Sequence, residues 1–340
     1  MSGALAFGWG CLRVLAGAET AQLSLHPEDN GRSYGGRKLP LAVTISVTHR
    51  CNLHCAHCQA ENDLAKPDIP TERMLALIDE LAAAGTVRVG FTGGEPLMRP
   101  DFGAILERCR SRKLIVSVVS NGYLVPRYAE VLRGTDLLFM SVDGDRAVHD
   151  RIRGAGAFDA FLKAADCARR NGIPVAALTT LMSYNADCLQ EMADTFARMG
   201  IHWMVSRVQT GFSGRSEQEL SPEALERALA VLRQAPCLRT SRRYLDFLAS
   251  GRPLERCYAG VSYAVIAPDG RLFPCFPAQF DHAAYGGGQE LLRQDFQTAF
   301  RKLPLYRATC ATCTLACHAE ANFLQEFNLE SILQSLRIRR

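Results

Sequence analysis

The chain has 340 residues, of which 48% are hydrophobic and 22% charged, a composition that suits a globular protein with one barrel-sized domain and a smaller one. Its 39 basic and 35 acidic residues leave a net charge of +4, too small to indicate a nucleic-acid partner. Thirteen cysteines are many for this length, and eight of them are spaced like metal ligands, which favours a reducing cytoplasm over a disulfide scaffold.

We interpret residues 1–37 as an N-terminal extension. Residues 4–15 are fairly apolar, but they include Gly8, Gly10 and Arg13, and no basic segment precedes them. The stretch is too short to cross a bilayer and lacks the layout of a signal peptide. We therefore expect a packed or frayed extension and no transmembrane segment, with weak membrane association as the alternative.

Residues 38–215 alternate short apolar runs with helical stretches, a pattern typical of strand–helix units around a parallel sheet. The expected strands are residues 41–47, 87–92, 115–119, 137–142, 175–182 and 203–208. The expected helices are residues 71–81, 101–112, 158–171 and 188–199. Six such units predict an α/β fold, a partial (β/α)6 TIM-like barrel that stays open, rather than a closed barrel of eight units.

Three cysteines directly follow the first predicted strand. Cys51, Cys55 and Cys58 are spaced four and three residues apart, so one tight loop brings their thiolates to a common metal centre. Iron–sulfur cubanes normally take four cysteine ligands, and a loop with only three leaves one iron open to bind and activate a small molecule. His54 and His57 keep a structural zinc site as the alternative, because zinc accepts mixed cysteine and histidine ligands.

The second predicted strand runs into Gly93, Gly94, Glu95 and Pro96. Two glycines allow the backbone to approach a ligand closely, and Glu95 offers a carboxylate to an amine. Further polar residues stand at or just after the ends of later strands, on the rim where βα barrels place their sites. They are Ser120, Asn121, Ser141, Asp143, Thr180, Asn185, Arg207 and Gln209. Any one of them could be a cap or a turn residue, but their common rim favours a binding site.

With Cys-x3-Cys-x2-Cys after the first strand and Gly-Gly-Glu-Pro after the second, the chain resembles the radical S-adenosylmethionine (radical SAM) superfamily. The resemblance implies that the open iron chelates the amino and carboxylate groups of S-adenosylmethionine, while Gly93, Gly94 and Glu95 hold its methionine amine. One electron from the reduced cluster then breaks the carbon–sulfur bond, and the resulting 5′-deoxyadenosyl radical takes a hydrogen atom from the substrate. An electron donor such as flavodoxin or ferredoxin is also implied.

Residues 141–144 and 149–154 resemble radical SAM enzymes that carry a C-terminal cysteine-rich extension. That resemblance places Ser141 beside the ribose of S-adenosylmethionine and Arg153 beside its carboxylate, with a surface salt bridge as the alternative for Arg153. Ser120 and Asn121 join this cofactor-binding set. His57 stands where the family usually has an aromatic residue near the adenine, and we expect it to pack there.

A second set of cysteines follows a helical connector of residues 216–250, whose first helix is expected to start at 221–223. In residues 251–340, two strands at 261–267 and 271–276 predict a hairpin that brings Cys257 and Cys275 together. Cys310, Cys313 and Cys317 come later, before a helical pattern at 321–336. This small α+β region resembles the SPASM and twitch extensions, which implies one auxiliary 4Fe–4S cluster. Its ligands would be Cys257, Cys275, Cys317 and either Cys310 or Cys313, and zinc is the alternative.

We therefore expect a radical SAM enzyme that removes hydrogen from an unactivated C–H bond. About 40 residues precede the first strand, too few for a peptide-binding domain, and this favours a small-molecule biosynthetic intermediate as the substrate. Maturation of a ribosomally made peptide and a non-enzymatic iron–sulfur or zinc protein remain the alternatives. No catalytic acid or base stands out among the candidates in the smaller region, which are Tyr258, Tyr263, Asp281, His282 and His318.

Overall fold

The computed structural model describes residues 33–34, 37–38, 40–58, 67–209, 216–254, 257–280, 287–304 and 313–325. Of the predicted N-terminal extension it describes only β1 (Ser33–Tyr34) and β2 (Arg37–Lys38), which pair antiparallel. Cys310, Asp281 and His282 lie outside the described residues. In the described part of the chain, no helix combines the length and the apolar composition that a membrane span needs.

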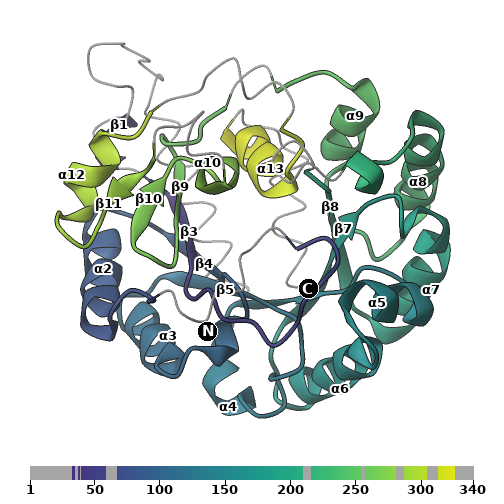
Figure 1. Ribbon diagram of the computed structural model, residues 1–340, viewed down its shortest axis with the longest axis horizontal. Coiled ribbons are helices and arrows are strands. Elements are labelled where there is room, and N and C mark those ends of the chain that lie inside the picture. The colour runs from purple at the N-terminus through teal and green to yellow at the C-terminus, as the bar shows by residue number, and fades with distance from the viewer. Residues whose placement is uncertain are drawn as a thin grey trace.

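The six predicted strands are confirmed and form one parallel sheet that curves into an open barrel (Figure 1). They are β3 (Ala42–Ser46), β4 (Arg88–Thr92), β5 (Ile115–Ser120), β6 (Leu137–Ser141), β7 (Val175–Leu181) and β8 (His202–Arg207). Each pairs with the next one along the chain. The predicted α/β partial barrel is therefore the observed fold.

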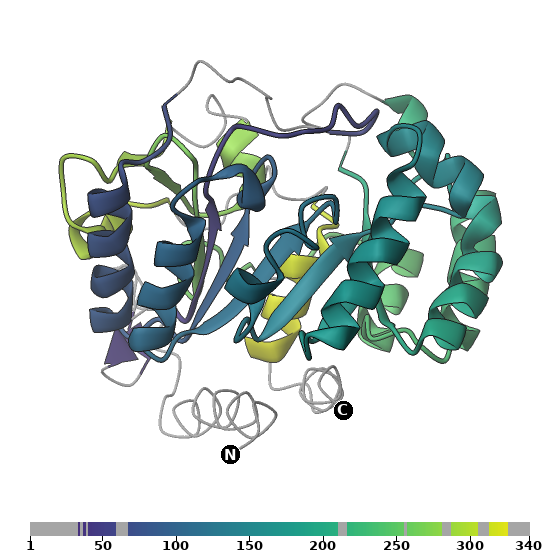
Figure 2. The same ribbon diagram turned by 90° about the horizontal axis from the view of Figure 1, so that it is seen from below.

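Helices cover the outer face of the sheet (Figures 1 and 2). They are α2 (Thr71–Ala83), α3 (Phe102–Ser111), α4 (Ala129–Leu132), α5 (Arg146–Arg153), α6 (Ala157–Arg170) and α7 (Leu189–Met199). Short 3-10 turns stand at η2 (Pro96–Met98) and η3 (Ala186–Cys188). The four predicted helices correspond to α2, α3, α6 and α7.

The alternation of buried and partly exposed residues along the strands explains why the helices pack against one face of the sheet. In β3, Val43 and Ile45 are buried, while Thr44 between them is partly exposed. In β4, Val89 and Phe91 are buried in the same way. Because successive side chains of a strand point to opposite faces, the large apolar residues form one core beneath the helices.

The predicted connector contains η4 (Ser216–Gln218), α8 (Pro222–Gln234) and α9 (Arg242–Ser250). The hydroxyl of Ser221 caps α8 by accepting from the N–H of Ala224, which confirms the predicted helix start. Between the two helices, Arg239 N–H donates to the carbonyl oxygen of Trp203 at 2.7 Å, so the connector covers the edge strand β8.

The C-terminal part of the chain continues the barrel sheet. Strand β9 (Tyr263–Ile266) pairs parallel with β3, and β10 (Arg271–Phe273) and β11 (Gln289–Glu290) follow antiparallel. The predicted hairpin is thus present as β9 and β10. The boundary placed at residue 251 stays a prediction.

Three helices complete this part of the chain: α10 (Phe276–Phe280), α12 (Phe296–Arg301) and α13 (Ala316–Gln325). Figure 1 shows α13 between β9 and β8, across the open side of the barrel. Ala316 N–H donates to Ser206 Oγ of β8, and Asn322 Oδ1 accepts from the N–H of Tyr258, which precedes β9. Helix α13 therefore contacts both the edge strand β8 and the segment that leads into β9. It covers residues 321–325 of the predicted helix at 321–336, and the remainder lies outside the described residues.

Candidate functional site

The cysteine loop, residues 51–58, begins just past β3 and is held against the end of β4. The N–H of Gly94 donates to the carbonyl oxygen of Thr48, and that of Glu95 donates to the carbonyl oxygen of Arg50, both at 2.8 Å. A Cβ atom on Gly94 would lie 2.0 Å from the Arg50 oxygen, and one on Gly93 would lie 2.7 Å from the Thr48 oxygen. The close approach that requires these glycines is therefore to the chain's own backbone.

Glu95 ties the ends of β4 and β5 together. Its buried carboxylate accepts hydrogen bonds from Asn121 N–H at 2.8 Å, Ser120 Oγ at 3.0 Å and Leu97 N–H at 3.2 Å. Burial raises the pKa of Glu95 to about 7, although these donors act in the opposite direction. The Nδ2 of Asn121 donates to Asn52 Oδ1 at 2.8 Å and lies 3.9 Å from Cys51 Sγ. Glu95, Ser120 and Asn121 thus support one side of the cysteine loop.

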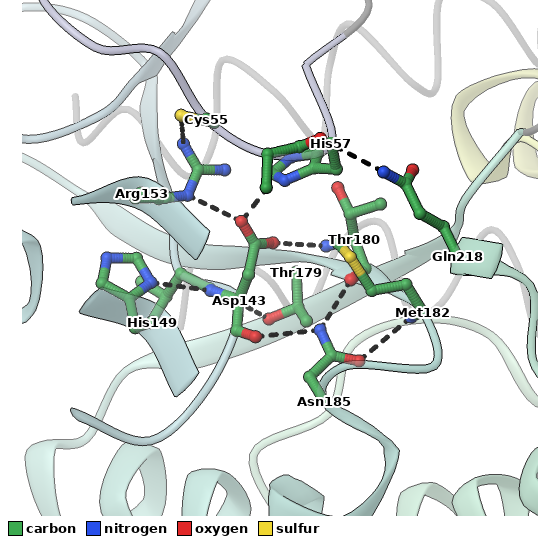
Figure 3. A network of polar contacts seen from close by, with 12 residues as sticks. Cys55, His57, Asp143, His149, Arg153, Thr179, Thr180, Met182, Asn185 and Gln218 are labelled. Atoms are coloured by element: carbon green, nitrogen blue, oxygen red, sulfur yellow. Dashed lines mark hydrogen bonds and ion pairs between the residues drawn. The ribbon is translucent and has the colours of Figure 1, made fainter. Parts of the chain in front are cut away.

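Asp143 supports the other side (Figure 3). Its fully buried Oδ2 accepts a hydrogen bond from Arg153 Nε at 2.6 Å and lies 3.7 Å from His57 Nε2. Its Oδ1 accepts from the backbone N–H of Thr180 at 2.8 Å. The backbone N–H of Asp143 donates to Nδ1 of His149 at 3.0 Å. One buried carboxylate therefore connects β6, β7, α5 and the cysteine loop.

Arg153 brings a positive charge to the cysteine loop. Its Nη1 lies 3.8 Å from Cys55 Sγ, and its side chain is only 10% exposed. Burial raises the pKa of the Cys55 thiol to about 11, although the Arg153 charge opposes that rise. Burial by itself would also raise the pKa of Asp143, but Arg153 and His57 outweigh it and hold that pKa below its usual value. Asp143 is thus an ionised carboxylate that neutralises part of the Arg153 charge.

The polar rim divides between two places. Ser120, Asn121, Asp143, Thr180 and Asn185 surround the support of the cysteine loop; Asn185 Nδ2 donates to the Asp143 carbonyl oxygen at 2.9 Å. Arg207 and Gln209 lie toward the C-terminal segment, where Gln209 forms a hydrogen bond with Thr314. Ser141 ends β6, and its hydroxyl has no hydrogen-bond partner in the part of the chain that the structure describes. Its ribose contact stays a prediction.

Two supports of the loop were not found from the sequence. The N–H of Ala56 donates to the carbonyl oxygen of Ile152 at 2.9 Å, and its carbonyl oxygen accepts from Gln218 Nε2 at 3.2 Å. The role of His149 as an acceptor was missed as well. Gln218 belongs to no recognisable sequence motif and lies more than 150 residues from the loop. No local sequence signal could therefore have identified it as a contact of the loop.

The second cysteine set gathers near the hydroxyl of Tyr263. Its Oη lies 3.4 Å from Cys257 Sγ. Burial, together with the nearby sulfurs of Cys257, Cys275 and Cys313, raises the pKa of Tyr263 well above its usual range. Cys317 lies four residues after Cys313, near the start of α13. The choice between Cys310 and Cys313 as fourth ligand stays a prediction, because Cys310 lies outside the described residues.

The residues around both sets suit negatively charged metal–thiolate groups. Arg153 and Asn121 direct N–H donors at sulfurs of the first set, and the hydroxyl of Tyr263 lies within hydrogen-bond distance of a sulfur of the second. Across the residues that the structure describes, no three histidine, cysteine or acidic side chains lie close enough together to hold a single metal ion. In a cubane, each cysteine sulfur binds a different iron. The thiols of a cubane site therefore lie farther apart than those around a single metal ion.

Comparison with known proteins relates this chain to one protein family. Residues 45–196 match the model of the radical SAM superfamily. The chain is 27% identical to the mycofactocin maturase MftC of Mycolicibacterium smegmatis, over 82% of this chain and 76% of that protein. It is 28% identical to the PqqA peptide cyclase of Granulibacter bethesdensis, over 71% of this chain and 68% of that protein. The crystal structure of Streptococcus suis SuiB bound to precursor peptide SuiA has a similar fold, with a TM-score of 0.65 at 17% identity, covering 80% of this chain and 67% of that one.

The maturase and the peptide cyclase contradict the predicted preference for a small-molecule substrate, both as the function and as the partner. That expectation depended on the short segment ahead of the first strand. The argument was wrong because a peptide can be presented by a separate chain, so the length of one segment does not determine what the barrel accepts.

Proposed function

Because this chain is a member of the radical SAM superfamily, we propose that it is a peptide-modifying enzyme that removes hydrogen from an unactivated C–H bond of a ribosomally made peptide. The observation that supports the peptide substrate is the identity to the PqqA peptide cyclase. It extends over 71% of the chain, which is more than the matched domain alone. Family membership makes the chain an enzyme, so a purely electron-carrying or zinc-binding role is set aside.

A 4Fe–4S cluster and S-adenosylmethionine are the cofactors of this family, and the relatives with a C-terminal extension carry auxiliary clusters. When bound, the first cluster supplies the electron that cleaves S-adenosylmethionine and yields the 5′-deoxyadenosyl radical. We assign Cys51, Cys55 and Cys58 as its protein ligands. Cys257, Cys275, Cys317 and one of Cys310 and Cys313 would hold the auxiliary cluster.

The roles of the surrounding residues follow from their contacts. Asp143 holds Arg153 through Nε, which directs Nη1 toward Cys55. The remaining nitrogen, Nη2, has no hydrogen-bond partner among the described residues and suits a carboxylate, such as that of S-adenosylmethionine. Glu95 lies at the end of β4, where the family resemblance places the methionine amine. Its three donors fix the carboxylate in that position.

We place the enzyme in the cytoplasm with an electron donor such as flavodoxin or ferredoxin. No disulfide joins any two of the cysteines that the structure describes, which is consistent with a reducing compartment. The net charge of +4 gives no reason to include a nucleic acid among its partners.

The test is anaerobic turnover of the reconstituted full-length protein with dithionite and S-adenosylmethionine. Synthetic peptides encoded by short reading frames beside the gene serve as substrates, and porphyrins and sugars are the small-molecule comparison. We expect a peptide to stimulate 5′-deoxyadenosine formation at least about tenfold and to change in mass, with both effects lost in Cys55→Ala. Stimulation by a small molecule and by none of the peptides would overturn the proposal.

A further inference from the structure

A tyrosine hydroxyl in the C-terminal region contacts both a proposed cluster ligand and a buried histidine. Tyr263 begins β9, where it pairs with Ala42 of β3, and the residue is 8% exposed. Its Oη lies 3.4 Å from Cys257 Sγ and 3.0 Å from His318 Nδ1. The tyrosine and histidine rings meet edge to face, with their centroids 4.8 Å apart. The hydroxyl has one proton, so it can donate a hydrogen bond to only one of these two neighbours.

The chemistry of the neighbours fixes the direction of these bonds. A metal-bound Cys257 is a thiolate, which accepts hydrogen bonds and donates none. His318 is 3% exposed, and its Nδ1 can donate a hydrogen bond to the tyrosine oxygen when that nitrogen carries the proton. Both contacts of Tyr263 are satisfied when His318 Nδ1–H donates to the tyrosine oxygen and the tyrosine O–H donates to the Cys257 sulfur. The other histidine tautomer would turn the hydroxyl away from the sulfur.

We propose that Tyr263 is a positioning residue that sets the reduction potential of the auxiliary cluster by donating a hydrogen bond to the sulfur of Cys257. His318 orients the hydroxyl by donating to its oxygen. A donor at a ligand sulfur stabilises the more negative, reduced form of an iron–sulfur cluster, so it raises the potential. This inference rests on the proposed function in one respect, the assignment of Cys257 as a cluster ligand.

The experiment isolates the auxiliary cluster in the full-length protein. The triple variant Cys51→Ala, Cys55→Ala, Cys58→Ala removes the ligands of the first cluster, and anaerobic reconstitution with iron and sulfide then loads the second. In this background we compare Tyr263→Phe with a matched control, Tyr258→Phe. Tyr258 is also buried, but its hydroxyl has no hydrogen bond among the described residues. The midpoint potential is measured by redox titration followed by electron paramagnetic resonance.

We expect Tyr263→Phe to shift the midpoint potential to more negative values at unchanged iron content, and Tyr258→Phe to leave it unchanged. His318→Leu should shift it in the same direction by less, and adding it to Tyr263→Phe should bring no further shift. Replacement of Tyr263 by 3-fluorotyrosine keeps the ring and strengthens the donor, so it should move the potential in the opposite direction. This second variant keeps the test decisive if Tyr263→Phe fails to assemble.

Equal potentials in the parent, Tyr263→Phe and 3-fluorotyrosine proteins at full iron content would overturn the role of Tyr263 and leave the proposed function intact. Absence of iron from the triple variant would refute the auxiliary ligand set, and the tyrosine proposal with it. Turnover of peptide by the unsubstituted enzyme reports separately on the proposed function.

Discussion

Replacing Gly94 with alanine would place a Cβ atom 2.0 Å from the carbonyl oxygen of Arg50 and 2.5 Å from its carbonyl carbon. These are backbone atoms, so they cannot rotate away, and the segment must move by about 1 Å to restore normal contact. The movement breaks the hydrogen bonds from Gly94 to Thr48 and from Glu95 to Arg50. Each buried backbone bond that is lost costs about 1 to 3 kcal/mol. We therefore expect Gly94→Ala to lower the free energy of unfolding by about 2 to 6 kcal/mol.

An unfolding entropy of about 2.1 cal/mol/K per residue over 340 residues converts this loss to a Tm lower by about 3 to 8 °C. Differential scanning calorimetry of the metal-free protein measures that shift, and iron analysis after reconstitution measures the state of the cysteine loop. Gly103→Ala in α3 is the control, because its Cβ would meet Val131 at an ordinary 3.6 Å. A Gly94→Ala protein with wild-type Tm and iron content that fails only to bind S-adenosylmethionine would refute this reasoning, since its glycine would then serve the ligand rather than the chain.

Three further substitutions test the site. Asp143→Ala leaves the buried Arg153 without its carboxylate, so we expect about 3 to 5 kcal/mol less stability in urea unfolding; a loss below about 1 kcal/mol would contradict this. Burial raises the pKa of Glu95 from 4.5 to about 7, so the folded protein binds that proton more tightly than the unfolded chain does. The stability of the wild type relative to Glu95→Gln should therefore fall as pH rises from about 4.5 to about 7, whereas a flat or rising difference would count against that pKa. Cys317→Ala should lose auxiliary iron, whereas Cys167→Ala in α6 should retain it by iron analysis.

The strands and longer helices could be predicted because their apolar residues repeat with the period of the element. The strand at 115–119 is observed as β5 (Ile115–Ser120), and the helix at 158–171 as α6 (Ala157–Arg170). Helix α5 (Arg146–Arg153) was missed because it is mostly polar and buries only His149 and Ile152. Its N-cap, Asp145, accepts from the N–H of Val148, a bond that the sequence alone does not reveal.

The partners of the site residues could not be predicted. Asp143 was recognised as a polar residue at a strand end, but its contacts come from Thr180 and His57, 37 and 86 positions away in the chain. Such pairs depend on how the elements are placed in space, and no local pattern encodes that placement. The pairing of Ala42 with Tyr263 is still harder to predict, because it joins the first barrel strand to the C-terminal region across more than 200 residues.

That same pairing has a consequence for electron movement. Tyr263, next to Cys257, stands level with the first residue of β3, and the Cys51 loop emerges beyond the last. Five residues of extended chain span about 16 Å. The two proposed cluster sites therefore lie toward opposite ends of β3 in a continuous hydrogen-bonded sheet. An electron that moved between the two sites would therefore pass along a single hydrogen-bonded sheet.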